Sequence, residues 1–189
     1  MITDFRKHFR INFDLAYPVM LGHFGQVMVQ VSDSMMVGRV GTESLGGATF
    51  ANSLFGVFLM MGIGMSYAIT PQTAKADGEN DHLKLTEILK HGLLVNFVFG
   101  VLLASALVIG NEVLWHFNQP ETIVELAIPY FKVIALSLIP FMIFQAFRQF
   151  AEGLGYTKQA MYITITANIV KILLNYIFIF VKLGFEHMG

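Results

Sequence analysis

The stretch Ala160–Val181, AMYITITANIVKILLNYIFIFV, holds twenty-two residues and a single charge, which Lys171 carries. A membrane-spanning helix needs about 20 mostly apolar residues, so this stretch predicts one. An ammonium at bilayer depth costs at least roughly 2.5–3.5 kcal/mol on insertion scales, so we expect a functional role and a partner for Lys171. Asp33 is the one acidic residue inside the long apolar runs. We therefore expect Asp33 and Lys171 to share one buried polar site.

The composition of the chain is that of a membrane protein. Of its 189 residues, 55% are hydrophobic and 13% are charged, against about 25% charged in an ordinary soluble domain. The net charge of −1 gives no basic signature for nucleic acid. The absence of cysteine excludes thiolate metal sites. No nucleophile–base pair and no His/Glu metal motif stands out, so the sequence predicts neither an enzyme nor a metal site.

Five apolar runs are long enough to cross a membrane: Leu15–Val37, Leu45–Ile69, Gly92–Ile109, Ile128–Phe147 and Ala160–Val181. An unpaired backbone cannot cross lipid, so all five are predicted to be helices. The expected fold class is an all-α integral membrane protein with five transmembrane helices over residues 1–189. We expect Pro71 to close the second span. From about Leu83, the following segment is expected to form an amphipathic helix at the membrane interface.

The basic residues between these spans predict the orientation. Eight Lys and Arg residues fall on the N-terminal arm and on the second and fourth connections, and two fall on the opposite side. Because Lys and Arg accumulate on cytoplasmic loops, the N-terminus is predicted to be cytoplasmic. The expected location is the cytoplasmic membrane, which the chain crosses several times.

Two polar stripes run along the first and fifth predicted helices. Their members are three or four residues apart and so share a face: Gln26, Gln30 and Asp33 on one helix, and Asn168, Lys171 and Asn175 on the other. Such faces look toward protein or water rather than lipid, so we expect these six residues to line a cation- or proton-coupling site or a substrate cavity. Interhelical hydrogen bonding is enough to explain the glutamines, whereas Asp33, Lys171 and Asn175 are expected to meet if the two helices are neighbours.

Proline and small residues predict the shape and packing of the spans. Pro18 and Pro140 each remove one backbone hydrogen bond inside a span and are predicted to kink it. Small residues let membrane helices approach closely. We expect this role for Gly22 with Gly25, Gly46 with Gly47, and Gly62 with Ser66.

Six stretches follow one another along nearly the whole chain: Leu15–Pro18, Val31–Gly41, Ser44–Gly47, Ala68–Gly78, Arg148–Lys158 and Leu173–Phe180. Their order and spacing resemble the N-terminal half of multidrug and toxic compound extrusion (MATE) transporters. The resemblance implies twelve helices in two six-helix lobes. It also implies efflux of amphipathic, often cationic, compounds, driven by inward protons or sodium through a cavity that opens alternately to each side.

By this resemblance, the chain supplies five helices of the first lobe. The sixth helix and the C-terminal lobe would be its partners, together with membrane lipid and small-molecule substrates. No cofactor is implied beyond the coupling ion, H⁺ or Na⁺.

The resemblance also gives roles to single residues. Asp33 falls on the family's first-helix aspartate, which binds a cation or a proton. Asn175 falls on a position that is often Asp in members with a sodium site in this lobe, and Lys171 on a position that is often Asn. A sodium ion beside Lys171 would be repelled at short range. We therefore expect the Lys171 ammonium to occupy the place of the ion and to pair with Asp33. The alternative is a fixed structural pair, with the coupling in the other lobe.

Two further readings of the whole chain stay open. A lipid-linked saccharide flippase of the same superfamily would be expected to carry several basic residues in its cavity, and this half offers only Lys171. A structural membrane subunit of five helices, complete as it stands, is the other.

Overall fold

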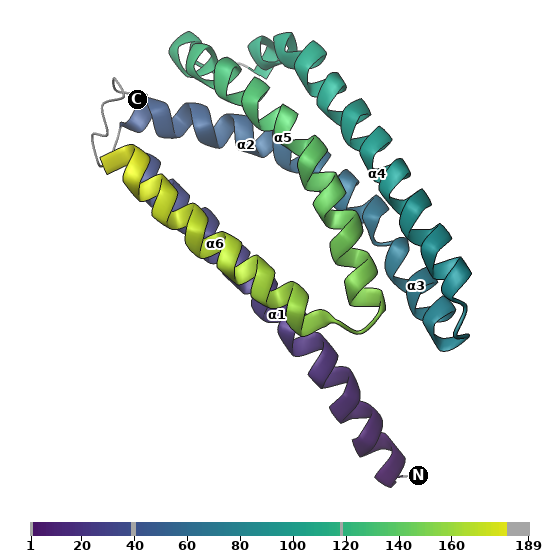
Figure 1. Cartoon of the computed structure of the whole chain (residues 1–189). Coiled ribbons are helices and arrows are strands. Elements are labelled where there is room, and N and C mark those ends of the chain that lie inside the picture. The colour runs from purple at the N-terminus through teal and green to yellow at the C-terminus, as the bar shows by residue number, and fades with distance from the viewer. Residues whose placement is uncertain (1, 39–40, 118, 181–189) are drawn as a thin grey trace. The chain divides into compact units, whose positions relative to one another are not determined.

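The computed structural model describes residues 2–38, 41–117 and 119–180, and these residues are helical almost throughout (Figure 1). No β-strand occurs within those ranges. The elements are α1 (Ile2–Gly38), α2 (Thr42–Ser66), α3 (Ile69–Gly78), α4 (His82–Ile109), the 3-10 helix η1 (Gly110–Phe117), α5 (Glu121–Gly153) and α6 (Thr157–Phe180).

The predicted all-α membrane fold is confirmed. The five predicted spans lie in α1, α2 with the start of α3, α4, α5 and α6, except that Val181 falls outside the described residues. Three helical stretches of the described chain are long and apolar enough to cross a membrane, namely Thr42–Gly78, His82–Phe117 and Glu121–Gly153. The helices α1 and α6, which hold the two polar stripes, carry the other two predicted spans.

Two local expectations are wrong. Pro71 does not close the second span, because α2 ends at Ser66 and Pro71 is the third residue of α3. Proline is tolerated in the first turn of a helix, where its missing N–H has no intrahelical partner. The segment from Leu83 is also not a separate interfacial helix. It belongs to the first turns of α4, whose N-cap Asp81 accepts a hydrogen bond from the Lys84 backbone N–H.

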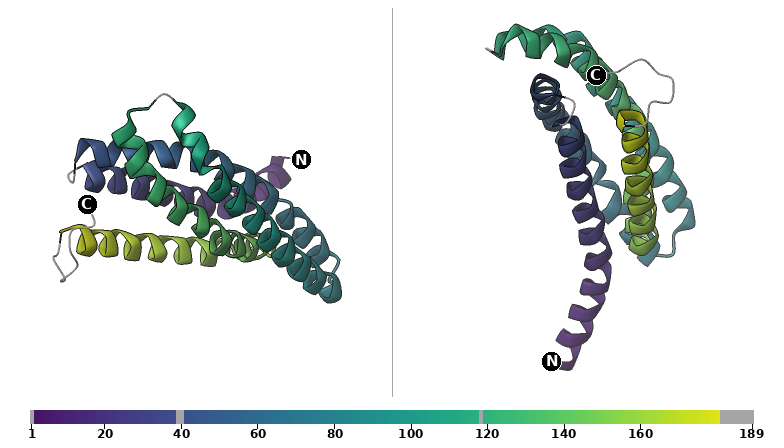
Figure 2. Two further views of the ribbon diagram at one scale, coloured as in Figure 1. Left: turned by 90° about the horizontal axis from the view of Figure 1, so that it is seen from above. Right: turned by 90° about the vertical axis from the view of Figure 1, so that its left-hand side faces the viewer.

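The chain divides into two compact units, one made of α2 to α5 and one made of α1 and α6. In the α2–α5 unit, α5 packs against α2, α3 and α4, and α4 and α5 lie side by side in Figures 1 and 2. Its core is formed by aliphatic side chains around Phe131, which is fully buried. Burial of these side chains away from lipid gives little hydrophobic gain, so close packing holds such helices together.

Glycines bring α2 and α3 close to α5 along their whole length. A Cβ at Gly47 would lie 3.2 Å from the Leu126 side chain, and a Cβ at Gly62 would lie 2.6 Å from Met142 Sδ. At Gly153 it would lie 2.8 Å from the Thr70 carbonyl oxygen. Gly47 and Gly62, each a member of a small-residue pair predicted for close packing, therefore lie at such contacts, and Gly153 adds a third contact point.

The second unit pairs α1 with α6. Gly25 of α1 faces Asn168 of α6, and Asp33 of α1 faces Lys171 and Asn175. Because the partners advance along both helices together, α1 and α6 run parallel. This arrangement brings the two predicted polar stripes into contact.

Candidate functional site

The carboxylate of Asp33 lies at the centre of the α1–α6 contact. Lys171 Nζ donates to Asp33 Oδ2 at 2.7 Å, and Asn175 Nδ2 donates to Asp33 Oδ1 at 2.7 Å. Each carboxylate oxygen therefore has its own N–H donor from α6. Hydrogen bonds in which one partner is charged are stronger than those between neutral groups.

The spacing of the α6 residues explains this arrangement. Lys171 and Asn175 are four residues apart, so they lie one above the other on one helix face. A helix rises about 1.5 Å per residue, which separates the two positions by roughly 6 Å along the axis. The long lysine side chain spans that rise, and both groups can reach one carboxylate. The helices α1 and α6 are thus neighbours, which is the condition under which Asp33, Lys171 and Asn175 were expected to meet.

The pair is neutral overall and is not sealed. The Lys171 side chain is 53% exposed and that of Asp33 is 27% exposed within the chain. An isolated ammonium or carboxylate at membrane depth is expensive, and pairing the two lowers that cost. The exposed part of Lys171 leaves N–H groups that water or another molecule could reach.

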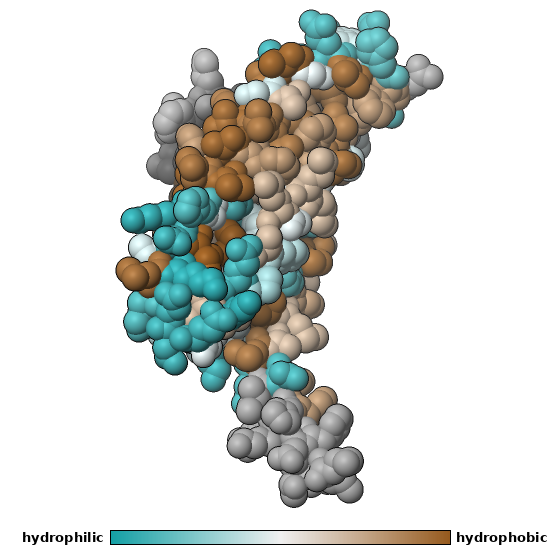
Figure 3. Space-filling model, turned by 90° about the vertical axis from the view of Figure 1, so that its right-hand side faces the viewer, coloured by the Kyte–Doolittle hydropathy of each residue, from teal (hydrophilic) through white to brown (hydrophobic). Residues whose placement is uncertain are grey.

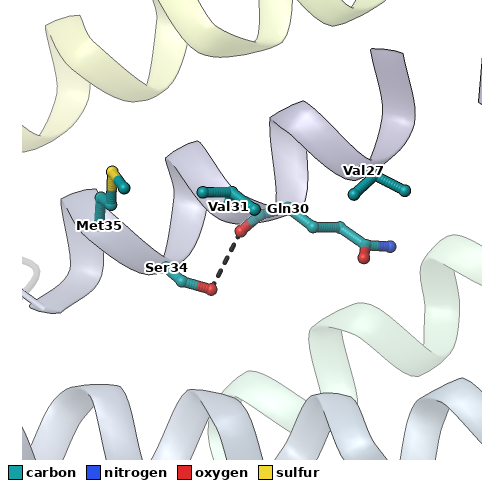
Figure 4. A pocket seen from close by; sticks show the side chains of 5 residues that line it. All are labelled: Val27, Gln30, Val31, Ser34 and Met35. Carbon is teal, nitrogen blue, oxygen red and sulfur yellow. Dashed lines mark hydrogen bonds between the residues drawn. The ribbon is translucent and has the colours of Figure 1, made fainter. Parts of the chain in front are cut away.

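The remaining members of the stripes lie around this pair rather than in it. Asn168 Nδ2 is buried and has no hydrogen-bond partner among the described residues. Gln26 is half-buried, and Gln30 is exposed. Gln30 lines an open hollow on α1 with Val27, Val31, Ser34 and Met35, and the Ser34 hydroxyl donates to the Gln30 carbonyl at 3.0 Å (Figure 4).

The prolines predicted to kink the spans both lie inside helices. Pro18 is buried in α1, and Pro140 is exposed in α5, which contains Pro129 as well. Each removes one backbone hydrogen bond from its helix. Their role as kinks remains a prediction.

The hydrogen-bond donors around Asp33 restrict which ions could bind to its carboxylate. Sodium, like other hard cations, needs oxygen ligands, and here nitrogen donors already occupy both carboxylate oxygens. The described residues also include no cluster of three or more His, Cys, Asp or Glu side chains that could hold a metal ion. A cation that bound to both Asp33 oxygens would therefore meet the Lys171 and Asn175 donors there.

Sequence reasoning missed a buried polar layer in the α2–α5 unit. Ser66 Oγ donates to Asn96 Oδ1 at 2.5 Å, and Thr70 Oγ1 donates to Gln149 Oε1 at 2.6 Å. Arg148 Nε lies 2.8 Å from an oxygen of Glu152. The available signal for Asn96 was its place as a lone amide inside an uncharged apolar run.

The fold and this charged pair define a class: a multi-helix integral membrane protein with an ion pair between two of its helices. The MatE family model matches residues 18–177, a range that contains Asp33, Lys171 and Asn175. The chain therefore belongs to the MatE family, and the resemblance stated from its motifs is confirmed.

Relatives and solved structures agree with this assignment. The chain is 28% identical to the probable multidrug resistance protein NorM of Rhizobium meliloti, over 96% of this chain and 39% of that protein. It is 27% identical to the multidrug resistance protein NorM of Photobacterium profundum, over 98% of this chain and 41% of the relative. Its fold is similar to that of an outward-facing multidrug resistance MATE family transporter, with a TM-score of 0.84 and 23% identity. The similarity covers 93% of this chain and 39% of the transporter.

The chain thus spans about two fifths of the length of the relatives that it matches.

Proposed function

We propose that this chain forms part of a secondary active antiporter that exports amphipathic or cationic compounds across the cytoplasmic membrane. Its relatives are named as multidrug resistance proteins, which supports drug export as the activity. The excess of Lys and Arg on one side supports a cytoplasmic N-terminus. The rest of the full-length protein would supply the second lobe, and the two lobes would open their shared cavity alternately to each side.

The observation that carries the proposal is the contact of Asp33 with Lys171 and Asn175. Protonation of Asp33 would remove its negative charge and with it the attraction for the ammonium. The site would then change from neutral to a charge of +1, and Lys171 would be released from the carboxylate. A change of one charge in a medium of low dielectric is large enough to bias two helix arrangements.

Protons are the coupling ion that these contacts favour. Sodium at Asp33 would have to displace the Lys171 ammonium or bind beside it, and the two cations repel each other. A proton needs no coordination shell, so it can add to a carboxylate oxygen once the ammonium moves away. We therefore propose proton coupling at this site, with no requirement for sodium.

The test is efflux of a fluorescent cationic dye by the full-length protein in vesicles, with an imposed pH gradient. Asp33→Asn keeps the shape of the side chain and removes its titratable group. Asp14→Asn is the matched control, because Asp14 is an exposed acid of the same helix. We expect Asp33→Asn to lose pH-driven efflux with sodium present or absent, and Asp14→Asn to retain it.

Efflux by Asp33→Asn that still follows the pH gradient would make the ion pair structural. The coupling would then lie outside the contacts described here. Restoration of Asp33→Asn efflux by a sodium gradient would separate transport from proton coupling and would contradict the choice of ion.

A further inference from the structure

A groove of about 370 Å³ lies between α2–α3 and α4, within the α2–α5 unit. It is lined by both polar and apolar side chains, and we call it the α3–α4 groove. Gln72 on α3 and Lys84, Glu87 and His91 on α4 are its exposed or half-buried polar lining, and the buried Asn96 of α4 lies among its apolar lining. In Figure 3, hydrophilic side chains gather over the α3–α4 end of the α2–α5 unit, beside a hydrophobic surface.

The boundary between the polar and apolar halves of the groove lies near the edge of the predicted membrane spans. Met65 and Val95 line its apolar part and belong to the predicted spans Leu45–Ile69 and Gly92–Ile109. Lys84, Glu87 and Gln72 belong to the connection between those spans. Both walls therefore pass from polar to apolar at the same level, as a phospholipid does where its headgroup meets its acyl chains.

Three hydrogen-bond acceptors are available in the polar half. Gln72 Nε2 donates to the Ala68 carbonyl at 3.0 Å, which leaves the Gln72 Oε1 atom as an acceptor. His91 Nδ1 lies 2.9 Å from the Glu87 carbonyl oxygen. Because a carbonyl only accepts, Nδ1 donates in this contact, and Nε2 is the ring nitrogen left to accept from a ligand. The Glu87 carboxylate takes part in no ion pair within the described chain and is the third acceptor.

One cation lines the groove beside these acceptors. Lys84 Nζ lies 3.1 Å from a carboxylate oxygen of Glu79, and the two side chains are 44% and 47% exposed. An exposed ion pair of this kind contributes little stability, so the Lys84 ammonium can turn toward another anion at small cost. The groove thus combines one cationic donor with three acceptors and an apolar extension.

We propose that the α3–α4 groove binds a phospholipid with a primary ammonium, of the phosphatidylethanolamine class. The three N–H groups of that ammonium match Glu87, His91 Nε2 and Gln72 Oε1, and the lipid phosphate pairs with Lys84. One acyl chain follows Met65 and Val95. A choline headgroup has no N–H to donate, and a glycerol headgroup has no cation for Glu87, so both fit the groove less well. This site is independent of the proton coupling proposed for Asp33.

The test uses the purified full-length protein in detergent, with lipid adducts counted by native mass spectrometry. The probes are dioleoyl phosphatidylethanolamine, phosphatidylcholine and phosphatidylglycerol, and free phosphoethanolamine. We expect wild type to retain phosphatidylethanolamine about tenfold more tightly than the other two lipids, a difference of about 1.4 kcal/mol. Free phosphoethanolamine, which has no acyl chain, should bind far more weakly.

Glu87→Lys should abolish the preference for phosphatidylethanolamine, because it places a cation where the lipid ammonium would lie. Glu125→Lys is the matched control, since Glu125 is an exposed acid on α5 that does not line the groove, and it should keep the preference. If Glu87→Lys fails to fold, Glu87→Gln should still reduce the preference several-fold.

Equal retention of phosphatidylethanolamine and phosphatidylcholine by wild type would overturn the proposal, and so would an undiminished preference in Glu87→Gln. Phosphatidylglycerol bound as tightly as phosphatidylethanolamine would mean a site for anionic headgroups instead. Equal binding of free phosphoethanolamine would also overturn the proposal of a phospholipid site, because the acyl chain would then play no part.

Discussion

The contacts inside the α2–α5 unit differ in chemistry from those inside the α1–α6 unit. In the α2–α5 unit, glycines bring apolar helices into contact, and fully buried side chains such as Phe131 and Leu138 form the core. In the α1–α6 unit, the contacts that stand out are polar: a carboxylate, an ammonium and an amide within hydrogen-bonding distance. The first unit has the features of a scaffold, and the second contains the ion pair that we propose to couple transport to protons.

This difference suggests how stability and function are separated in the chain. Tight contacts that involve backbone atoms, as at Gly153, leave no room for a second arrangement. A contact made of one charged pair can be broken by a single proton. Substitutions in the α2–α5 unit should therefore lower stability, whereas substitutions at Asp33 and Lys171 should mainly alter coupling.

The largest loss of stability is expected from Gly153→Ala. The new Cβ would lie 2.8 Å from the Thr70 carbonyl oxygen and 2.7 Å from Thr73 Cβ, so α3 and α5 would have to move apart. Overpacking of this kind costs about 3 kcal/mol, which a lower apparent melting temperature in detergent would reveal. Gly64→Ala is the control, because nothing lies within 4 Å of its new Cβ. Equal melting temperatures for the two variants would show that the close contact at Gly153 does not stabilise the α2–α5 unit.

A smaller loss is expected from Ser66→Ala in the same unit. Ser66 is fully buried and donates to Asn96 Oδ1, so the variant leaves a buried amide oxygen without its donor. The expected cost is about 1–2 kcal/mol, measured by the same melting experiment. Ser53→Ala serves as the control, since the Ser53 hydroxyl bonds its own helix at an exposed position and should be nearly neutral. A Ser66→Ala protein as stable as Ser53→Ala would argue against a structural role for the polar layer.

The smallest effect on stability is expected from Gly25→Ala, the same change made in the α1–α6 unit. Its new Cβ would lie 3.3 Å from Asn168 Nδ2, the end of a side chain that can move by a few tenths of an ångström. We expect the melting temperature to change far less than in Gly153→Ala. A comparable drop in melting temperature in Gly25→Ala and Gly153→Ala would show that helices pack equally tightly in both units.

The sequence predicted the helices better than the contacts between them. The five apolar runs are helical within the described residues, apart from a turn at Tyr67 and Ala68. The polar stripes indicated that Asp33, Lys171 and Asn175 would meet if α1 and α6 were neighbours. The stripes gave this result because charge is rare in membrane helices, so few pairings were possible.

The errors and omissions arose where local signals compete with tertiary context. Pro71 was expected to end a helix, but its place in the first turn of α3 makes it harmless there. The contacts of Ser66 with Asn96 and of Thr70 with Gln149 depend on the register between distant helices. Uncharged polar residues permit many pairings, so their sequence positions alone did not identify these partners.

Lys171→Asn tests whether the Lys171 ammonium occupies the place of a coupling ion at Asp33. The measurement is dye efflux by the full-length protein in vesicles, across a range of pH gradients and with sodium present or absent. Wild type is expected to follow the pH gradient without sodium, and Lys171→Asn is expected to lose this dependence. A Lys171→Asn protein that keeps full efflux and the wild-type pH dependence would contradict this role of the ammonium.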